Sequence, residues 1–564
     1  MTSEQTQEQP QKLGWRFPST FWYANGAELC ERAAFYGMFI TLFRYLNEAV
    51  GFTDVETGWI TGAFASILYF LPTFMGIIAD KTGFKSALIV AFTLLAAGYS
   101  LLGAYQLKST ALISLALIMF GGAIIKPVIS GTVAKCSDSA HRARAMSIFY
   151  MVVNIGSFSG KGLAGELNEV LGLQYINFYA GGMSFVALVL VSLFYKNPDT
   201  EGTGKTVGEA VRGLLRVMLH FRFLSLILII GGFWAIQGQL YASMPTYIER
   251  LLGKGYKPEW LANINPLVVV ICVVPITNLV RHFKPANAIS IGLAIIPFTA
   301  LVISLSPLVE SAAGESLNLG LFALHPLVLM FIIGIGLQGL AECFLSPKWL
   351  EYASKQAPKG EVGLYLGFSH LTTFFAWLFG FILAGYLLHG YCPDPKTFTP
   401  EVRHQWRLAT DAEYRFTLEE ARLAELGDAG AIPESIRAAF ADNGVVLAAG
   451  ATLATEEPRD KWKKDPEGTW KITSADHVFR IEEVRFDIET EVEGEERSGK
   501  MIELLVLADE PRPREETPPV PEVYNRAHYI WYIFTGIGVA AFLAILVFKW
   551  VTDAIDRGRA AEEN

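Results

Sequence analysis

The chain has 564 residues, of which 52% are hydrophobic and 18% are charged, and its mean hydropathy is +0.34. Soluble proteins carry about 25% charged residues, so this composition excludes an ordinary soluble enzyme. The net charge of −9 is uneven, because residues 391–525 hold 30 acidic and 17 basic residues whereas the remainder holds 25 and 29. A slightly basic, apolar body therefore carries one acidic, polar insert, and no basic patch suggests nucleic-acid binding.

Apolar stretches of the length that crosses a bilayer, about 20 residues, occur twelve times. Residues 1–14 are polar and do not have the pattern of a removable signal peptide, so we expect the first apolar stretch to direct insertion. Two groups of six stretches flank a basic, amphipathic linker, which predicts an all-α membrane protein made of two six-helix halves. The predicted spans are 20–47, 57–80, 85–107, 110–134, 144–169, 174–195, 222–250, 258–281, 286–308, 325–353, 363–389 and 526–551.

Loop charge predicts the orientation of these spans. With the N-terminus in the cytoplasm, twenty lysines and arginines of the short loops and tails fall inside and four fall outside. This is the bias of the positive-inside rule. We expect a multi-pass protein of the cell (inner) membrane with both ends in the cytoplasm and the insert outside. The predicted regions are a tail at 1–19, the first bundle at 20–195, a linker at 196–221, five helices at 222–389, the insert at 390–525, the twelfth helix at 526–551 and a tail at 552–564.

Two six-span halves joined by a cytoplasmic linker are the arrangement of the major facilitator fold, which binds its substrate at the midplane between the halves. The stretch from Gly76 to Lys85, GIIADKTGFK, resembles the loop motif of that superfamily. In that motif, glycines permit a tight turn, and an Asp and a Lys tie neighbouring helix ends together. The sequence therefore predicts a 12-helix major facilitator fold.

Ionisable residues inside the spans are the candidate functional groups. A charge at the bilayer centre costs about 2.5–3.5 kcal/mol and persists only when it is paired or faces a water-filled cavity. In the first span the spacing i, i+3, i+4 puts all three charged residues on one helix face. A static internal salt bridge is one interpretation, and a proton and anion site is the other. The candidates for proton coupling are Glu28, Glu31, Arg32, Lys126 and Glu342.

Lys126 and Glu342 come from opposite halves, and a pair between them could open and close with the halves. Polar residues on other spans could bond a ligand or join helices. These are Tyr36, Tyr69, Asn154 and Asn265. Lys161 and His370 are weaker candidates, because Lys161 is near a helix end and could snorkel toward water, and a lone His in a span usually packs.

At these residues the sequence resembles the proton-dependent oligopeptide transporter family. Glu28 begins ELCERAAFYGM, which is similar to the family signature ExxERFxYYGM of the first span. Similar stretches follow in the expected order on the fourth, fifth, eighth and tenth spans. They are GGAIIKP from Gly121, FYMVVNIGS from Phe149, INP from Ile264 and AECFLSP from Ala341.

The resemblance implies inward proton flow coupled to the uptake of di- and tripeptides, with protons and small peptides as the partners. It implies that Arg32 and Lys126 hold the peptide carboxylate, and that Glu342, Asn154 and Asn265 hold the amine. Tyr36 and Tyr69 would line the pocket and bond the peptide backbone. Glu28 and Glu31 would carry protons that Arg32 senses, and Lys126 would also pair with Glu342.

The chain departs from the family pattern at several positions. Phe35 replaces the first tyrosine of the signature, and Val128 replaces the asparagine after Lys-Pro. Phe39 and Gly238 stand where many members have a basic residue and a glutamate that pair across the outer gate. Because both residues of this pair are absent, neither charge is left without its partner. The number of protons transported with each substrate and the control of the outer gate are then open.

The insert is the remaining feature. Its alternating stretch at 469–507 suggests strands, 395–443 reads as a loop followed by helices, and 512–521 reads as a proline-rich linker. A small α+β domain and a partly disordered loop are both compatible with this pattern. Cys392, His404 and His477 do not have the spacing of metal ligands.

Three functions are compatible with the sequence. The first is proton-coupled import of di- and tripeptides, and the second keeps the fold but carries another small organic anion or modified peptide. The third is a membrane sensor or scaffold that acts through the insert. An enzyme is not expected, since no nucleophile–base arrangement is visible, and no cofactor or metal is expected.

Overall fold

The structure is a computed structural model whose described residues form two compact units. The helical unit comprises Met1–Tyr247, Lys257–Tyr391 and Arg526–Asn564, and the insert unit comprises Ile248–Tyr256 and Cys392–Asn525. Most of the tail at 1–19 and of the proline-rich stretch at 512–521 lie outside the described residues. The structure describes residues 17–138, 141–198, 207–253, 256–314, 316–318, 320, 323–357, 362–399, 402, 406, 415–418, 429–442, 447, 449–455, 469–474, 477–492, 495–508 and 521–562.

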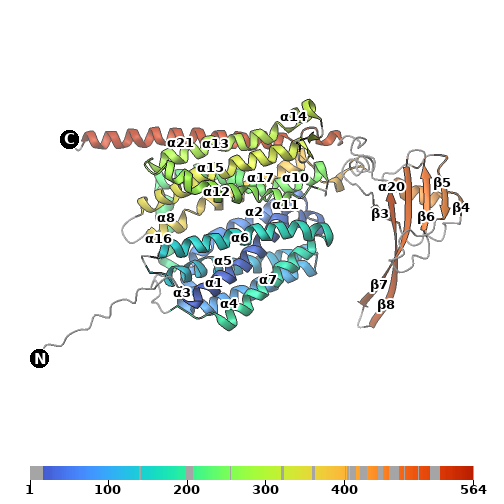
Figure 1. Ribbon diagram of the computed structural model, residues 1–564, viewed down its shortest axis with the longest axis horizontal. Coiled ribbons are helices and arrows are strands. Elements are labelled where there is room, and N and C mark those ends of the chain that lie inside the picture. Colours follow the sequence, from blue (N-terminus) through green and yellow to red (C-terminus); the bar gives the residue numbers. More distant parts are fainter. Residues whose placement is uncertain are drawn as a thin grey trace. The chain divides into compact units, whose positions relative to one another are not determined.

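The first helical bundle is built from the N-terminal part of the chain (Figure 1). Pro72 starts α3 directly after α2, and the missing N–H of proline accompanies a 48° bend between them. Thr53 and Glu56 form a capping box that begins α2. The helices are α1 (Ser19–Arg44), the π-helical turn η1 (Tyr45–Ala49), α2 (Asp54–Phe70), α3 (Pro72–Thr82), α4 (Phe84–Ala104), α5 (Lys108–Lys135), α6 (Arg142–Val170) and α7 (Leu173–Phe194).

The second bundle follows α8 (Val207–Leu219), which lies in the predicted amphipathic linker. Several of its spans are interrupted by short breaks. Its helices are α9 (Phe221–Gln237), η2 (Gly238–Leu240), α10 (Ser243–Leu252), α11 (Pro258–Leu261), α12 (Ile264–Leu279), α13 (Pro285–Ser304), α14 (Ser306–Ala313), α15 (Pro326–Gln356), α16 (Val362–Phe368), α17 (Leu371–Tyr391) and α21 (Tyr529–Glu562). A two-stranded sheet, β1 (Leu317–Asn318) and β2 (Ala323–Leu324), precedes α15.

Each of the twelve predicted spans coincides with a helix or a broken pair of helices. In the described part of the chain, nine helices are long and apolar enough to cross a membrane, or ten if the bent pair α2–α3 is one span. The other two, α1 and α6, have 26 and 29 residues and are more polar. Glu28, Glu31 and Arg32 of α1 and Lys161 of α6 lie inside the bundle, which is where a membrane protein tolerates charged residues.

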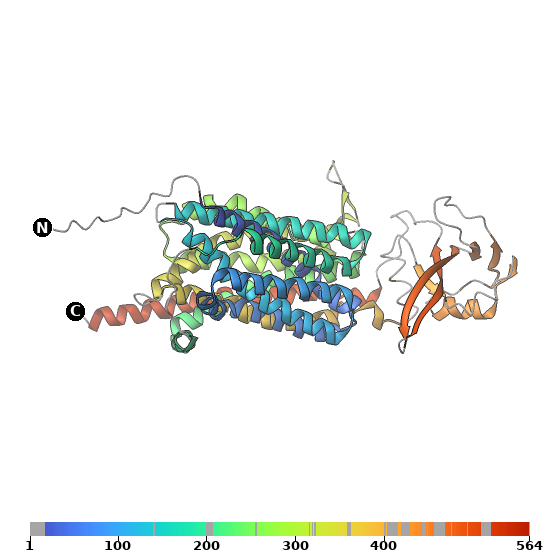
Figure 2. The same ribbon diagram turned by 90° about the horizontal axis from the view of Figure 1, so that it is seen from below.

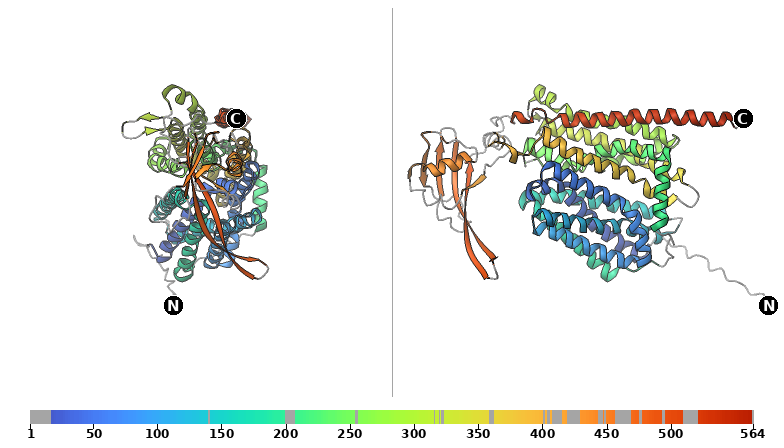
Figure 3. Two further views of the ribbon diagram at one scale, coloured as in Figure 1. Left: turned by 90° about the vertical axis from the view of Figure 1, so that its right-hand side faces the viewer. Right: turned by 180° about the vertical axis from the view of Figure 1, so that it is seen from behind.

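The two bundles meet along helices of similar direction (Figure 2). Helix α2 packs along α17, and α6 contacts α11. A Cβ on Gly58 would lie 2.6 Å from the carbonyl oxygen of Phe381, and one on Gly385 would lie 2.5 Å from that of Asp54. Small residues here let the two backbones approach closely, as in other membrane helix pairs. Within the second bundle α21 packs against α13 and α9 (Figure 3).

The insert unit contains a six-stranded antiparallel sheet with the strand order β3-β8-β7-β6-β5-β4. Strands β6 to β8 lie where the alternation predicts strands, but β3 and β4 fall in the stretch expected to be loop and helix. These two strands have four and three residues, too few to show alternation, and pairing with longer neighbours defines them. The strands are β3 (Arg415–Leu418), β4 (Ala429–Ala431), β5 (Thr452–Thr455), β6 (Thr469–Ser474), β7 (His477–Val492) and β8 (Glu495–Ala508).

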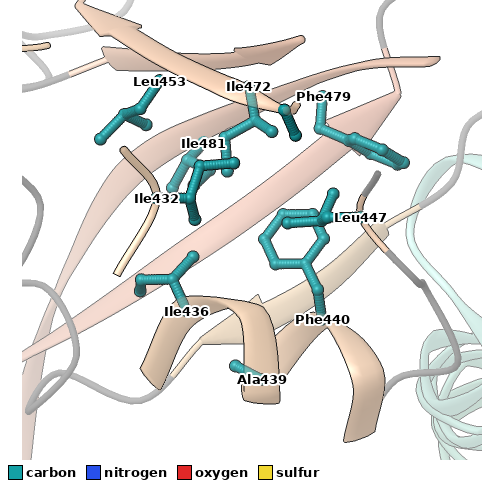
Figure 4. Close-up of a cluster of buried hydrophobic side chains, with 10 residues drawn as sticks. Ile432, Ile436, Ala439, Phe440, Leu447, Leu453, Ile472, Phe479 and Ile481 are labelled. Atoms are coloured by element: carbon teal, nitrogen blue, oxygen red, sulfur yellow. The ribbon is translucent and has the colours of Figure 1, made fainter. Parts of the chain in front are cut away.

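In the described part of the insert, helix α20 (Glu434–Asp442) covers part of this sheet. Its side chains Ile436 and Phe440 point toward Ile472, Phe479 and Ile481 of the sheet (Figure 4). The rings of Phe440 and Phe479 meet edge to face with 5.4 Å between their centroids. The described part of the insert therefore has its own hydrophobic core. Two short 3-10 turns, η3 (Pro395–Thr397) and η5 (Glu522–Tyr524), lie near its ends.

Candidate functional site

Helix α1 carries a compact cluster of three charges. The Nε of Arg32 lies 3.0 Å from Oε1 of Glu28 and also contacts Oε2 of Glu31. The three side chains are at most 6% exposed. The two carboxylates therefore hold the guanidinium in place, and because a charge in this setting needs a partner, the three residues act as one unit.

Two glycines of α6 allow this cluster to pack. A Cβ on Gly156 would lie 2.7 Å from Cβ of Arg32, and one on Gly160 would lie 2.3 Å from the carbonyl oxygen of Ala33. Helix α6 can thus approach the charged face of α1 only because both positions lack side chains. The spacing of four residues puts both glycines on one face of α6.

Lys126 on α5 lies over an aromatic ring. Its Nζ is 3.6 Å from the ring centroid of Tyr69, a cation–π contact. The same ring meets Trp377 of α17 edge to face, with 4.9 Å between centroids. His370, which was a weak sequence candidate, has its ring centroid 6.4 Å from that of Tyr69. Tyr69 therefore links the lysine of the first bundle to an aromatic side chain of the second.

Glu342 on α15 has a different set of neighbours. Asn265 Nδ2 donates a hydrogen bond of 3.4 Å to Oε2 of Glu342. The amine of Lys126 lies over Tyr69 instead. Among the described residues no ion pair within 4 Å joins Lys126 and Glu342, so the pair expected from the sequence is not formed in this conformation.

The structure also changes the interpretation of Lys161. Instead of reaching toward water from a helix end, its side chain is only 1% exposed. Its Nζ donates a hydrogen bond of 3.2 Å to the carbonyl oxygen of Ala262, which lies between α11 and α12 of the other bundle. Lys161 therefore joins the two bundles beside the segment that carries Asn265, the residue that bonds Glu342.

The remaining predicted residues lie around these groups. Tyr36 is half-buried, and the guanidinium carbon of Arg32 is 6.0 Å from its ring centroid. Asn154 is half-buried, and its Nδ2 donates to the carbonyl oxygen of Tyr150 on its own helix at 2.8 Å. No hydrogen bond from Asn154 to Glu342 is present within the described residues, so the grouping of these two residues is not formed here.

Aromatic side chains occupy the place of the missing gate charges. Phe39 stacks on Trp377 and Phe381, with ring centroids 5.4 Å and 6.1 Å apart. A Cβ on Gly238 would lie 2.8 Å from Cε1 of Phe381 and 3.1 Å from Cδ1 of Trp377. The two departures from the family pattern are therefore linked, because the glycine leaves the space that the stacked rings fill.

A buried ion pair joins the bundles beyond this stack. Nη1 of Arg44 lies 2.9 Å from Oε1 of Glu259, and the side chains are 2% and 1% exposed. Nearby, Lys257 pairs with Glu166 and Glu169 of α6 at 2.8 Å and 2.6 Å. These hydrogen bonds raise the pKa of the Lys257 amine above its ordinary value. Contacts of opposite charge thus hold the bundles together at this end.

The loop motif expected after the second span lies at the opposite end of the first bundle. Asp80 Oδ1 of α3 is 3.9 Å from Nζ of Lys135 on α5, whose amine also lies 4.2 Å from the ring centroid of Phe84. Asp80 therefore ties neighbouring helix ends together, with Lys135 as its partner.

Sequence reasoning missed the Arg44–Glu259 pair and the aromatic stack. Both charged residues lie at the edges of predicted spans, where charges are common, so composition offered no signal. Within the described residues no group of three or more His, Cys, Asp or Glu side chains is placed to hold a metal ion.

Comparison with known proteins identifies the class to which this fold and site belong. Residues 30–314, about half of the chain, match the family model of the Major Facilitator Superfamily. The chain therefore belongs to the Major Facilitator Superfamily and is a multi-pass membrane transporter, not an enzyme. The 12-helix fold predicted from the sequence is confirmed.

Two relatives are similar to this chain over more than half of its length. The chain is 24% identical to dipeptide and tripeptide permease A of Citrobacter koseri, covering 65% of this chain and 84% of the permease. It is 25% identical to multidrug resistance protein MdtH of Escherichia coli O1:K1, covering 61% of this chain and 80% of that protein. The names of these two relatives refer to different substrates, peptides in the first and drugs in the second.

Solved structures of POT family transporters have the same fold. One, in complex with 5-aminolevulinic acid, matches with a TM-score of 0.57 and 19% identity, covering 67% of this chain and 92% of that one. A peptide transporter POT in complex with sulfate matches with a TM-score of 0.56 and 20% identity, covering 70% and 92%. The likeness agrees with the family resemblance of the motifs in α1, α5 and α6.

Proposed function

We propose that this protein is a proton-coupled symporter that imports di- and tripeptides by alternating access. One observation carries the proposal: the two bundles present opposite charges toward a ligand. Arg32 and Lys126 belong to the first bundle, and Glu342 belongs to the second. A ligand with an anionic end can therefore bind one bundle while its other end contacts the second, and such binding draws the bundles together.

In this proposal the peptide carboxylate binds Arg32 of α1 and Lys126 of α5, the basic side chains of the first bundle that the family motifs contain. Glu342, with Asn265 bonded to it and Asn154 on α6, receives the other end of the peptide. Tyr36 and Tyr69 line the path between these groups and offer hydroxyls to the peptide backbone. The names of the peptide permease relative and of the POT structures support this cargo.

Proton coupling is assigned to the buried carboxylates. Glu28 and Glu31 compete for the single guanidinium of Arg32, so a peptide carboxylate that takes over Arg32 releases them to bind protons. Glu342 is half-buried and can exchange a proton when the bundles rearrange around it. In the conformation described here Lys126 contacts Tyr69, and its pairing with Glu342 belongs to another state of the cycle.

The proposed orientation rests on loop charge. Both ends of the chain lie in the cytoplasm, the protein lies in the cell membrane, and the insert at 390–525 lies outside. The end of the bundles with the Arg44–Glu259 pair is then the outer end, and its contacts describe a conformation closed to the outside. The bundles at 20–195 and 222–389, with the helix at 526–551, would move about the central site.

The test is uptake into liposomes that contain the purified protein, with and without an inward acid gradient. The substrate is a pool of di- and tripeptides, dialanine among them, with free and with acetylated amino ends. We expect accumulation that a protonophore abolishes and that Glu342→Gln lacks. Glu56→Gln is a matched control, because Glu56 pairs with Lys108 on the surface and should leave uptake unchanged. If folded protein accumulates no peptide from the pool, the proposal is wrong.

A second candidate keeps the fold and proton coupling and changes the cargo to another small organic anion or modified peptide. The relative named as a multidrug resistance protein and the POT structure that holds 5-aminolevulinic acid favour keeping it. The departures at Phe35, Phe39 and Gly238 point in the same direction. Uptake of labelled organic anions without uptake of peptides would support it.

A sensor or scaffold acting through the insert is the third candidate. The hydrophobic core of the insert shows that it can fold, which any binding role requires. This candidate expects deletion of the insert to abolish function while Lys126→Ala has no effect. The symporter proposal expects Lys126→Ala to abolish uptake.

A further inference from the structure

Lys161 is a buried amine that the proposed division of roles does not use. An ammonium group has three donors, and the structure gives this one a single hydrogen bond within the described residues, to the carbonyl oxygen of Ala262. The side chain is 1% exposed, so water does not satisfy the other donors. A buried cation with one neutral acceptor requires an anion nearby.

Glu342 is the carboxylate that the neighbouring contacts bring toward Lys161, although no ion pair within 4 Å joins the two side chains among the described residues. Asn265, which bonds Glu342, lies three residues after Ala262, so one short segment of the second bundle contacts both groups. The ring centroid of Tyr36 is 5.8 Å from Nζ of Lys161, which places the amine beside another residue of the proposed peptide site.

Without a ligand, the site holds equal numbers of basic and acidic side chains. The cations are Arg32, Lys126 and Lys161, and the carboxylates are Glu28, Glu31 and Glu342. A zwitterionic peptide that brings its ammonium group to Glu342 would place a second cation near Lys161, and like charges repel strongly where water is scarce. A peptide with an uncharged amino end avoids this repulsion and still offers its carboxylate to Arg32 and Lys126.

We propose that Lys161 determines specificity by supplying the cation at Glu342, so that the site takes short peptides with an uncharged amino end at least as well as zwitterionic ones. This inference rests on the proposed peptide transport and defines its substrate class more narrowly. N-acylated dipeptides are the simplest members of that class.

The experiment compares uptake of dialanine and N-acetyl-dialanine by the full-length protein in liposomes under an inward acid gradient. We expect the ratio of acetylated to free peptide to be one or more in the natural protein. Lys161→Gln should lower this ratio about tenfold or more, because it removes the cation that repels the amino end. Lys161→Arg keeps the charge and should keep the ratio above that of Lys161→Gln. Lys108→Gln removes an exposed lysine and should leave the ratio unchanged.

The ratio separates a role in specificity from a role in structure, because loss of the hydrogen bond to Ala262 would lower uptake of both peptides alike. Exclusive uptake of dialanine by the natural protein would overturn the inference while leaving the proposed peptide transport intact. An unchanged ratio in folded Lys161→Gln would also overturn it. If Lys161→Gln does not fold, the ratio in the natural protein still decides. If neither peptide is taken up, both proposals fail together.

Discussion

Arg44 and Glu259 form an ion pair between the two bundles, with 2.9 Å between Nη1 and Oε1 and almost no exposed surface on either side chain. The residues are 215 positions apart in the chain. Burial removes water from both charges, so Glu259 depends on Arg44 for compensation, whereas Arg44 also has Glu48, whose Oε1 lies 3.6 Å from its Nε. The pair therefore stabilises contact between the bundles at this end only while both partners are present.

Breaking the Arg44–Glu259 pair should destabilise the protein. Arg44→Met should cost about 3–5 kcal/mol because the buried carboxylate of Glu259 loses its cation, and Glu259→Met should cost less because Arg44 keeps Glu48. The double variant should unfold at a higher temperature than the worse single variant, as measured by thermal unfolding in detergent. The exposed pair Lys108–Glu56 is the matched control, and breaking it should cost less than about 1 kcal/mol. Simple addition of the two single effects would contradict this account.

Adding a methyl group at Gly238 should disturb the aromatic stack. In Gly238→Ala the new Cβ would lie 2.8 Å from Cε1 of Phe381, and such overpacking costs about 1–3 kcal/mol. We expect slower uptake together with a lower unfolding temperature, and Phe381→Leu in the same chain should recover part of both. Gly336→Ala, where nothing lies within 4 Å of the added atom, should have little effect on either measurement.

The approach of α6 to α1 should tolerate no side chain at Gly160. The added Cβ of Gly160→Ala would lie 2.3 Å from the carbonyl oxygen of Ala33, and backbone cannot move aside as a flexible side chain can. We expect loss of folded protein, measured as the monodisperse fraction in detergent. Gly182→Ala in the same bundle places its Cβ in open space and should preserve that fraction. Equal behaviour of the two variants would show that the close contact is not formed.

The ring of Tyr69 should matter more than its hydroxyl for holding Lys126. Tyr69→Leu removes the cation–π contact, which is worth about 0.5–2 kcal/mol, and should weaken peptide affinity by about 2- to 30-fold. Tyr69→Phe keeps a ring under the amine and loses only the hydroxyl proposed to bond the peptide backbone, so it should weaken peptide affinity less than Tyr69→Leu does. Competition of unlabelled peptide with labelled uptake measures both affinities. A larger loss in Tyr69→Phe would assign the main role to the hydroxyl.

The insert should unfold independently of transport when its core is damaged. Phe440→Ala removes a fully buried ring and should cost the insert about 3–5 kcal/mol. Limited proteolysis should then cut within residues 392–525 faster, whereas Glu434→Gln on the exposed face of α20 should not change the rate. Unchanged peptide uptake by Phe440→Ala is expected for a symporter, and loss of function would favour the scaffold.

Hydropathy predicted the membrane spans well because a bilayer imposes a length and an apolar composition on every helix that crosses it. The charged helix α1 was recognisable for the opposite reason, since three ionisable residues on one face of a span are too costly to occur without a role. Helices α1 and α6 are too polar to qualify as apolar spans, and they are the helices that carry Arg32, Asn154 and Lys161. These signals are local and need no tertiary structure.

The partners of those charges could not be predicted in the same way. The sequence suggested that Lys126 meets Glu342, but the structure places Lys126 over Tyr69 and bonds Lys161 to Ala262, three residues before the Asn265 that bonds Glu342. The short strands β3 and β4 were also missed, because their hydrogen bonds come from distant segments. Pairing of this kind depends on which residues the fold brings together.

Local sequence was thus sufficient for the number of spans, the division into two bundles and the recognition of which spans carry charged groups. Tertiary packing decided how those groups combine: Arg44 with Glu259, Phe39 with Trp377, and Lys161 with the segment that holds Glu342. The physical reason is that helix formation and membrane insertion depend on residues within a few turns. Contacts between the bundles instead join residues more than a hundred positions apart, whose geometry exists only once both bundles have packed.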